Sequence, residues 1–172
     1  LVGNLKVLTW AHEMGCPWNR LTCLRAACGT TPSHLACLVY AHTHGCAFDA
    51  RVFADAAATA PLSTLRYLFD EGCPYDESLA ESAAAHGRLD VLETFPSTAK
   101  SGGIAVTSAA ASHGHLPCLK FAVERLECDV DERALSTAAA WGHKECVRYL
   151  VAARCPGWDA YDEAWSPGSP QW

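Results

Sequence analysis

Histidine and cysteine side chains, the usual protein ligands of zinc, stand close together at two points of the chain. The run His42-Thr43-His44-Gly45-Cys46 has a partial counterpart in His12 and Cys16. In the register of the repeats described below, however, other segments place Phe or Val where His12 and His42 stand, and no paired Cys-x-x-Cys knuckle occurs. We therefore predict no metal site and no metal cofactor.

Catalytic motifs of the common kinds are missing from the sequence. It contains no Gly-rich loop followed by Lys-Ser/Thr to cradle a phosphate, and no Gly-x-Ser-x-Gly nucleophile turn. His115 and His143 occupy equivalent positions in two similar segments. Pro61 and Arg88 take that place elsewhere, so a shared catalytic role for these histidines is not expected. We predict no catalytic residue, no organic cofactor and no enzymatic activity.

The elements that position these residues recur with a period close to 27 residues. Each copy reads as an Ala-rich helix end, a glycine and a second, amphipathic helix; the clearest glycines are Gly87, Gly114 and Gly142. A second anchor, Gly-Cys followed by a loop with an aromatic residue, has the same period and stands at Gly15-Cys16, Gly45-Cys46 and Gly72-Cys73. Two independent sequence motifs, the helix–glycine–helix pattern and the Gly-Cys loop, share one period, which indicates a repeat protein.

The pattern Ala-Ala-x-x-Gly-His resembles the second half of an ankyrin repeat, and the resemblance covers residues 1–165. It implies an all-α solenoid of stacked helix-turn-helix repeats and a structural, hydrogen-bonding role for His115 and His143. The repeats are shorter than the usual length of about 33 residues and lack the Thr-Pro-Leu-His tetrapeptide. We therefore expect little or no β-hairpin.

We predict a single repeat domain over residues 1–165 and an extended tail over 166–172. The repeats are expected near 1–18, 19–48, 49–75, 76–102, 103–130 and 131–158, with a partial repeat at 159–165. Inner helices are predicted near 20–29, 49–59, 76–86, 103–112 and 131–140. Outer helices are predicted near 4–14, 33–44, 60–71, 87–95, 115–126 and 143–153.

One repeat is irregular, because Pro96-Ser97-Thr98-Ala99-Lys100-Ser101-Gly102-Gly103 replaces the usual helix end and Gly-Cys loop. Proline and the Ser/Gly run predict a flexible loop here, which is either a hinge or binding loop or a decayed repeat. The chain opens without Met and without the first helix of its repeat. We therefore expect a preceding helix, with any targeting segment upstream of Leu1.

The charge balance argues against two classes of partner. The net charge is −6, with 13 basic and 19 acidic residues mixed along the chain, which disfavours binding to nucleic acid or to an anionic membrane surface. No apolar run approaches the length of a membrane span, so direct membrane insertion is not expected.

Ten cysteines raise the question of disulfide bonds. Five of them share the loop position of the repeat: Cys16, Cys46, Cys73, Cys128 and Cys155. Stacked repeats place equivalent atoms about a helix diameter apart, beyond the ~7 Å Cα separation that a disulfide tolerates. We expect mostly buried, reduced thiols, which favours an intracellular reducing compartment.

These observations predict a non-enzymatic scaffold, adaptor or subunit of a larger assembly that binds proteins through a rigid repeat array. The alternative is a cysteine-rich metal-binding or redox-responsive protein. Trp141 is the leading candidate contact, either as a binding hot spot or as a ring packed on the following helix. Further candidates lie on the inner-helix surface and at the chain end: Arg20, Arg25, Arg51, Glu77, Glu81, Glu132, Arg133 and Trp172.

Overall fold

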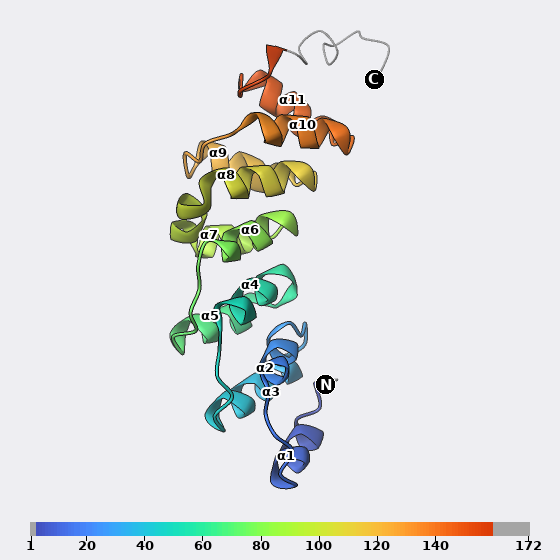
Figure 1. Ribbon diagram of the computed structural model, residues 1–172, viewed down its shortest axis with the longest axis vertical. Helices are drawn as coiled ribbons and strands as arrows, with labels where there is room; N and C mark the ends of the chain where they lie inside the picture. The colour runs from blue at the N-terminus through green and yellow to red at the C-terminus, as the bar shows by residue number, and fades with distance from the viewer. Residues whose placement is uncertain (1–2, 160–172) are drawn as a thin grey trace. The chain divides into compact units, whose positions relative to one another are not determined.

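The computed structural model describes residues 3–159, which form eleven α-helices and no strand (Figure 1). The expected all-α repeat fold is confirmed. In chain order the helices are α1 (Leu5–Glu13), α2 (Arg20–Ala27), α3 (Pro32–Thr43), α4 (Ala50–Thr59), α5 (Leu62–Asp70), α6 (Ser78–Ala85), α7 (Leu89–Thr94), α8 (Pro96–Ser112), α9 (Leu116–Glu124), α10 (Glu132–Ala140) and α11 (Lys144–Ala152). None of the helices in this part of the chain is long and apolar enough to cross a membrane.

The chain divides into two compact units, residues 1–79 and 80–172, and α6 contains the boundary. In the N-terminal unit, inner helix α2 packs on α3 and α4, α4 packs on α5, and α1 packs on α3. In the C-terminal unit, α8 packs on α9 and α10, α10 packs on α11, and α9 also contacts α7 and α11. Each unit therefore contains inner–outer, inner–inner and outer–outer helix contacts. The single domain over 1–165 with its tail remains a prediction.

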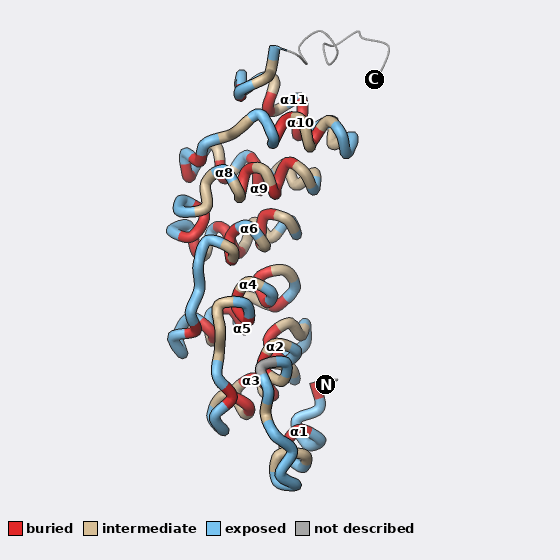
Figure 2. The backbone as a smooth tube through the Cα atoms, in the orientation of Figure 1, coloured by how far each residue is buried: buried red, intermediate tan, exposed pale blue. Residues whose placement is uncertain are grey.

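Small residues on the inner helices and leucines on the outer helices build the core. Ala56 and Ala57 on α4 are fully buried, and their short side chains let the adjacent helices approach closely. Five of the six outer helices bury a leucine at one shared position, represented by Leu38, Leu65 and Leu92, and α11 buries Val147 there. Each such leucine contributes about 1.5–3 kcal/mol of transfer free energy. Figure 2 shows buried segments inside the helices and exposed segments mainly at the turns.

Polar caps fix where the inner helices begin. The side chains of Asn19, Asp49 and Asp131 each accept a hydrogen bond from the backbone N–H three residues ahead, at 3.2, 3.0 and 3.1 Å. Each bond satisfies one of the backbone donors that have no partner inside the first helical turn. Asp76 accepts hydrogen bonds from the side chain and backbone of Ser78, which lower the pKa of its carboxyl.

The predicted flexible loop after Phe95 is wrong. Residues 96–102 are helical, and only Gly103, with φ 4° and ψ −85°, interrupts α8. Pro96 occupies the first helical turn, where its missing N–H costs nothing and its fixed φ suits a helix. Thr98 and Ala99 are buried, so tertiary packing holds this turn in place. The segment is thus a short helix joined to the inner helix through a kink.

Candidate binding surface

Three exposed side chains occupy the same position of successive repeats in the C-terminal unit: His86, His113 and Trp141, here called the turn row. Each stands immediately before a glycine of positive φ that ends an inner helix, and Trp141 is 73% exposed. The other two rings are held by their own helices, because Nδ1 of His86 and of His113 donates to a carbonyl oxygen four residues earlier, at 2.9 and 3.0 Å. The turn row is therefore a line of rings at one end of the inner helices.

A second set of histidines ties the turns of neighbouring repeats together. His115 Nε2 donates to the Ala85 carbonyl oxygen at 3.0 Å, and His143 Nε2 donates to that of Ser112 at 2.9 Å. Each acceptor belongs to the last turn of the preceding inner helix, whose final carbonyls have no partner inside the helix. The two bonds fix the spacing of the turns that carry the turn row.

The glycines of these turns lie directly beneath the histidine rings. Gly114 has φ +75°, and a Cβ built on it would stand 2.5 Å from His143 Nδ1. At Gly87, with φ +69°, the corresponding distance to His115 Nδ1 is 2.7 Å. Glycine is therefore required at both positions for two reasons. It adopts the left-handed backbone conformation without strain, and it leaves room under the histidine ring.

The structure places the charged candidates in different parts of the molecule. Arg25 and Arg51 are exposed on α2 and α4, and Glu77 is exposed just before α6, all in the N-terminal unit. In the C-terminal unit Glu81 is exposed on α6, and Glu132 and Arg133 begin α10, the helix that ends at Trp141. Arg20 begins α2. Trp172 and the tail 166–172 lie outside the described residues. Among the candidates that the structure describes, Glu81, Glu132 and Arg133 share a unit with the turn row.

The histidines first considered as zinc ligands make aromatic and hydrogen-bonding contacts. His12 Nδ1 is hydrogen-bonded to the Tyr40 hydroxyl (3.2 Å), and its ring stacks on Trp18 at 4.6 Å between centroids. His42 repeats this arrangement one repeat later, with the Tyr67 hydroxyl (3.1 Å) and the Phe48 ring (4.1 Å between centroids). No group of three or more His, Cys, Asp or Glu side chains within residues 3–159 could hold a metal ion.

Two of the loop cysteines, Cys46 and Cys73, are buried and hydrogen-bonded. The thiols of Cys46 and Cys73 donate to the carbonyl oxygens of Asn19 and Asp49, the cap residues of the preceding inner helices, at 3.7 and 3.6 Å. Burial raises the pKa of Cys73 to about 11, so the reactive thiolate is scarce at neutral pH. All ten cysteines are free, eight of them are buried, and Cys16 alone is exposed. These properties give the metal or redox alternative no support.

A family model described as ankyrin repeats in three copies matches residues 53–161, which is more than half of the chain. No curated protein and no solved structure shows a significant match to the chain.

Proposed function

The chain belongs to the ankyrin-repeat family, and from this premise we propose that it is a non-enzymatic scaffold, adaptor or subunit of a larger assembly. Ankyrin repeats are generally protein–protein interaction modules, and the family is typically non-enzymatic. The partners in this proposal are one or more proteins. Nucleic acid is not among them, because a net charge of −6 repels a polyanion.

The observation that carries the proposal is the exposed ring of Trp141 on a rigid turn. Tryptophan is one of the residue types most enriched at binding hot spots, where its large ring is buried in water-excluded contact with the partner. Trp141 stands 73% exposed, at a position where the two preceding repeats carry exposed imidazoles. The turn row thus offers three rings in line to a protein surface that crosses the ends of the inner helices.

Rigidity supports the same proposal. The turns that carry His86 and His113 are tied to the next repeat by the hydrogen bonds of His115 and His143. A partner that binds there does not have to order the backbone, so little affinity is lost to conformational entropy. Glu132 and Arg133, at the other end of α10, offer charges that would set partner choice more than affinity.

The test is co-purification of the full-length protein from its native source, followed by affinity measurements between the isolated partner and the purified chain. Trp141→Ala is expected to weaken binding at least 10-fold, since a hot-spot tryptophan contributes about 2 kcal/mol or more. Trp10→Ala is the matched control, because Trp10 is also strongly exposed (61%) but lies on α1 in the N-terminal unit. Equal affinity of the Trp141 variant and the unsubstituted chain would remove the turn row from the proposal.

A further inference from the structure

Two exposed aromatic rings touch each other at the loop between α5 and α6. Phe69, on the last turn of α5, is 46% exposed, and Tyr75, in the loop, is 42% exposed. Their ring centroids lie 5.8 Å apart, with an angle of 42° between the ring planes. These two side chains are here called the aromatic pair. Both belong to the N-terminal unit, whereas the turn row belongs to the C-terminal unit.

The aromatic pair departs from the arrangement of the two preceding repeats. There the ring of the loop stacks on a histidine, as Trp18 does on His12 at 4.6 Å between centroids. Phe48 stacks on His42 in the same way, and all four side chains are half-buried. Each histidine is also hydrogen-bonded to a tyrosine hydroxyl of the next outer helix, a bond that Phe69 cannot make. The third repeat therefore exposes two rings where the first two repeats half-bury theirs.

The structure holds the aromatic pair in a fixed position. Gly72, with φ +70°, turns the chain at the end of α5, and its N–H donates to the Phe69 carbonyl oxygen at 3.0 Å. The Tyr75 ring stands edge-on against the buried ring of Phe53, with 5.5 Å between centroids. A partner that binds the pair does not have to order this loop, so little affinity is lost to conformational entropy.

Negative charge surrounds the aromatic pair. Four exposed acidic residues follow the two rings in the chain: Asp70, Glu71, Asp76 and Glu77. Because consecutive Cα atoms are 3.8 Å apart, the carboxylates of Asp70 and Asp76 lie within about 10 Å, roughly one Debye length, of the ring beside them. Residues 67–87 include no Lys or Arg, and Arg66 is the one basic residue that directly precedes them. The potential at the two rings is therefore negative.

Other repeats contain one of these two features without the other. Residues 12–20 and 42–50, the equivalent segments of the first two repeats, contain one acidic residue each. The loop between α9 and α10 carries Val123 and Val130 at the positions of the aromatic pair. Exposed carboxylates are nevertheless frequent in that loop, among them Glu124, Glu127 and Asp129. Exposed rings and a surplus of carboxylates thus coincide in the third repeat.

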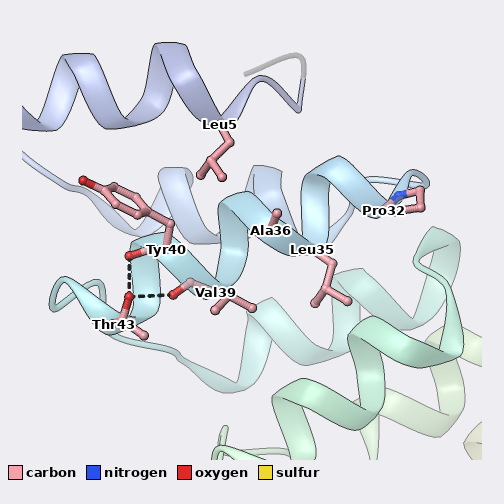
Figure 3. Close-up of a pocket in the computed structure, with 7 residues that line it drawn as sticks. All are labelled: Leu5, Pro32, Leu35, Ala36, Val39, Tyr40 and Thr43. Carbon is pink, nitrogen blue, oxygen red and sulfur yellow. Dashed lines mark hydrogen bonds between the residues drawn. The ribbon is translucent and has the colours of Figure 1, made fainter.

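The N-terminal unit also contains an uncharged apolar surface, a groove of about 530 Å³ between α1 and α3. Leu5 of α1 and Leu35, Val39 and Tyr40 of α3 belong to its lining (Figure 3). Helix α3 contains no Asp, Glu, Lys or Arg, and no charged residue lines the groove. Its walls therefore select no partner by charge, whereas the loop that carries the aromatic pair does.

An arginine side chain matches both features of this loop. Its planar guanidinium stacks on the face of an aromatic ring and donates hydrogen bonds in its own plane, which suits carboxylates beside the rings. The ammonium of lysine is a compact, strongly hydrated charge and gains less from a ring. An uncharged apolar side chain would cover the rings but would take water from the carboxylates without replacing it.

We propose that the aromatic pair is a docking site for a basic segment of a partner protein, which places an arginine on the two rings and further basic side chains near Asp70 and Glu77. The site uses no residue of the turn row and lies in the other unit, so it is independent of the proposed function. Because its charges are exposed, binding weakens as salt is added.

The probe for the test is a labelled, flexible Gly/Ser peptide that carries several arginines. Fluorescence anisotropy with the whole 172-residue chain measures its affinity. A peptide with lysine in place of every arginine has the same charge and is the comparison. We expect the arginine peptide to bind at least about 5-fold more tightly, because the guanidinium stacks on the rings as well as pairing with the carboxylates.

The first variant removes the rings and keeps the charge. Phe69→Val/Tyr75→Val installs the side chains that the fifth repeat carries at these positions, Val123 and Val130. We expect it to abolish the preference for arginine over lysine, while weak binding through charge persists. Phe69→Val alone keeps the contact of Tyr75 with Phe53 and should lower the preference with circular dichroism and urea unfolding unchanged.

The second variant removes charge and keeps the rings. Asp70→Asn/Glu77→Gln takes away two negative charges and leaves Asp76, which caps α6, intact. We expect about a 5-fold loss of affinity for the arginine peptide. Glu127→Gln/Asp129→Asn is the matched control, because it removes the same charge from the loop without rings. It should change the affinity by less than about 2-fold.

Three results overturn the proposal. These are equal affinity for the arginine and lysine peptides, an unchanged preference for arginine in the Phe69→Val/Tyr75→Val variant, and equal losses of affinity in the two charge variants. The last result would mean that the net charge of the chain, and not this loop, attracts the peptide. Trp141→Ala is expected to leave peptide affinity unchanged, so failure here and failure of the turn row are told apart.

Discussion

Replacing Gly114 with alanine tests whether the histidines between repeats hold the turns in place. Gly114 and Gly142 share the same φ of +75°, but their surroundings differ. An added Cβ at Gly114 would lie 2.5 Å from His143 Nδ1, whereas at Gly142 no described atom lies within 4 Å. Gly142→Ala therefore reports the cost of the left-handed backbone alone, and the difference between the two variants reports the histidine contact.

The magnitudes follow from the structure. Alanine in the left-handed region costs about 1 kcal/mol, which is the whole effect expected for Gly142→Ala. At Gly114 the ring of His143 must also move, which costs about 1 kcal/mol in overpacking and about 1 kcal/mol through the lost 2.9 Å bond to the Ser112 carbonyl oxygen. We expect a total of about 3 kcal/mol for Gly114→Ala.

Urea unfolding followed by circular dichroism measures the free energy of unfolding of both variants. Gly15→Ala is a second control, because a Cβ added at Gly15 would have no described atom within 4 Å. The double variant Gly114→Ala/His143→Ala removes the ring, so the cost of the alanine should fall to about 1 kcal/mol on the His143→Ala background. Equal destabilisation by Gly114→Ala and Gly142→Ala, within about 0.5 kcal/mol, would refute the reasoning.

Two further outcomes are expected. Glu127 has φ +56° at a loop position where three other repeats carry glycine, so Glu127→Gly should stabilise the chain in urea by up to about 1 kcal/mol; a loss of stability would contradict this. In a native thiol titration only Cys16 should react fast, and Cys16→Ser should abolish that phase, because Cys118 and Cys146 are buried and burial raises each pKa to about 11. Several fast thiols would revive the redox alternative.

Much of the fold could be predicted because the same helix-capping residues and helix-ending glycines recur in successive repeats. Asn19, Asp49 and Asp131 cap the inner helices as residues of that type should, and Gly87 and Gly114 end them in the left-handed conformation. Helix ends then fall within a few residues of the predicted ones, since caps and glycines act through neighbours three to five residues away.

The sequence-based predictions failed where contacts between residues far apart in the chain determine the local structure. Pro96 and the Ser/Gly run read as a loop, but burial of Thr98 and Ala99 against the rest of the unit holds a helical turn there. The lack of charge on α3 shows only when the repeats are compared position by position, because Val39 stands where other outer helices carry Arg66, Glu93, Lys120 and Arg148. The missing charge is visible only in the alignment of the repeats and not in any single motif.

The sequence alone determined the helix type, the period and the caps, because these depend on side chains acting within one or two helical turns. Only the tertiary structure decided that Trp141 stays exposed, that His143 reaches the Ser112 carbonyl oxygen and that Leu5 and Val39 line one groove. Those facts depend on the distance between helices that lie some 30 residues apart in the chain. That distance is set by how neighbouring repeats pack, which no single repeat encodes.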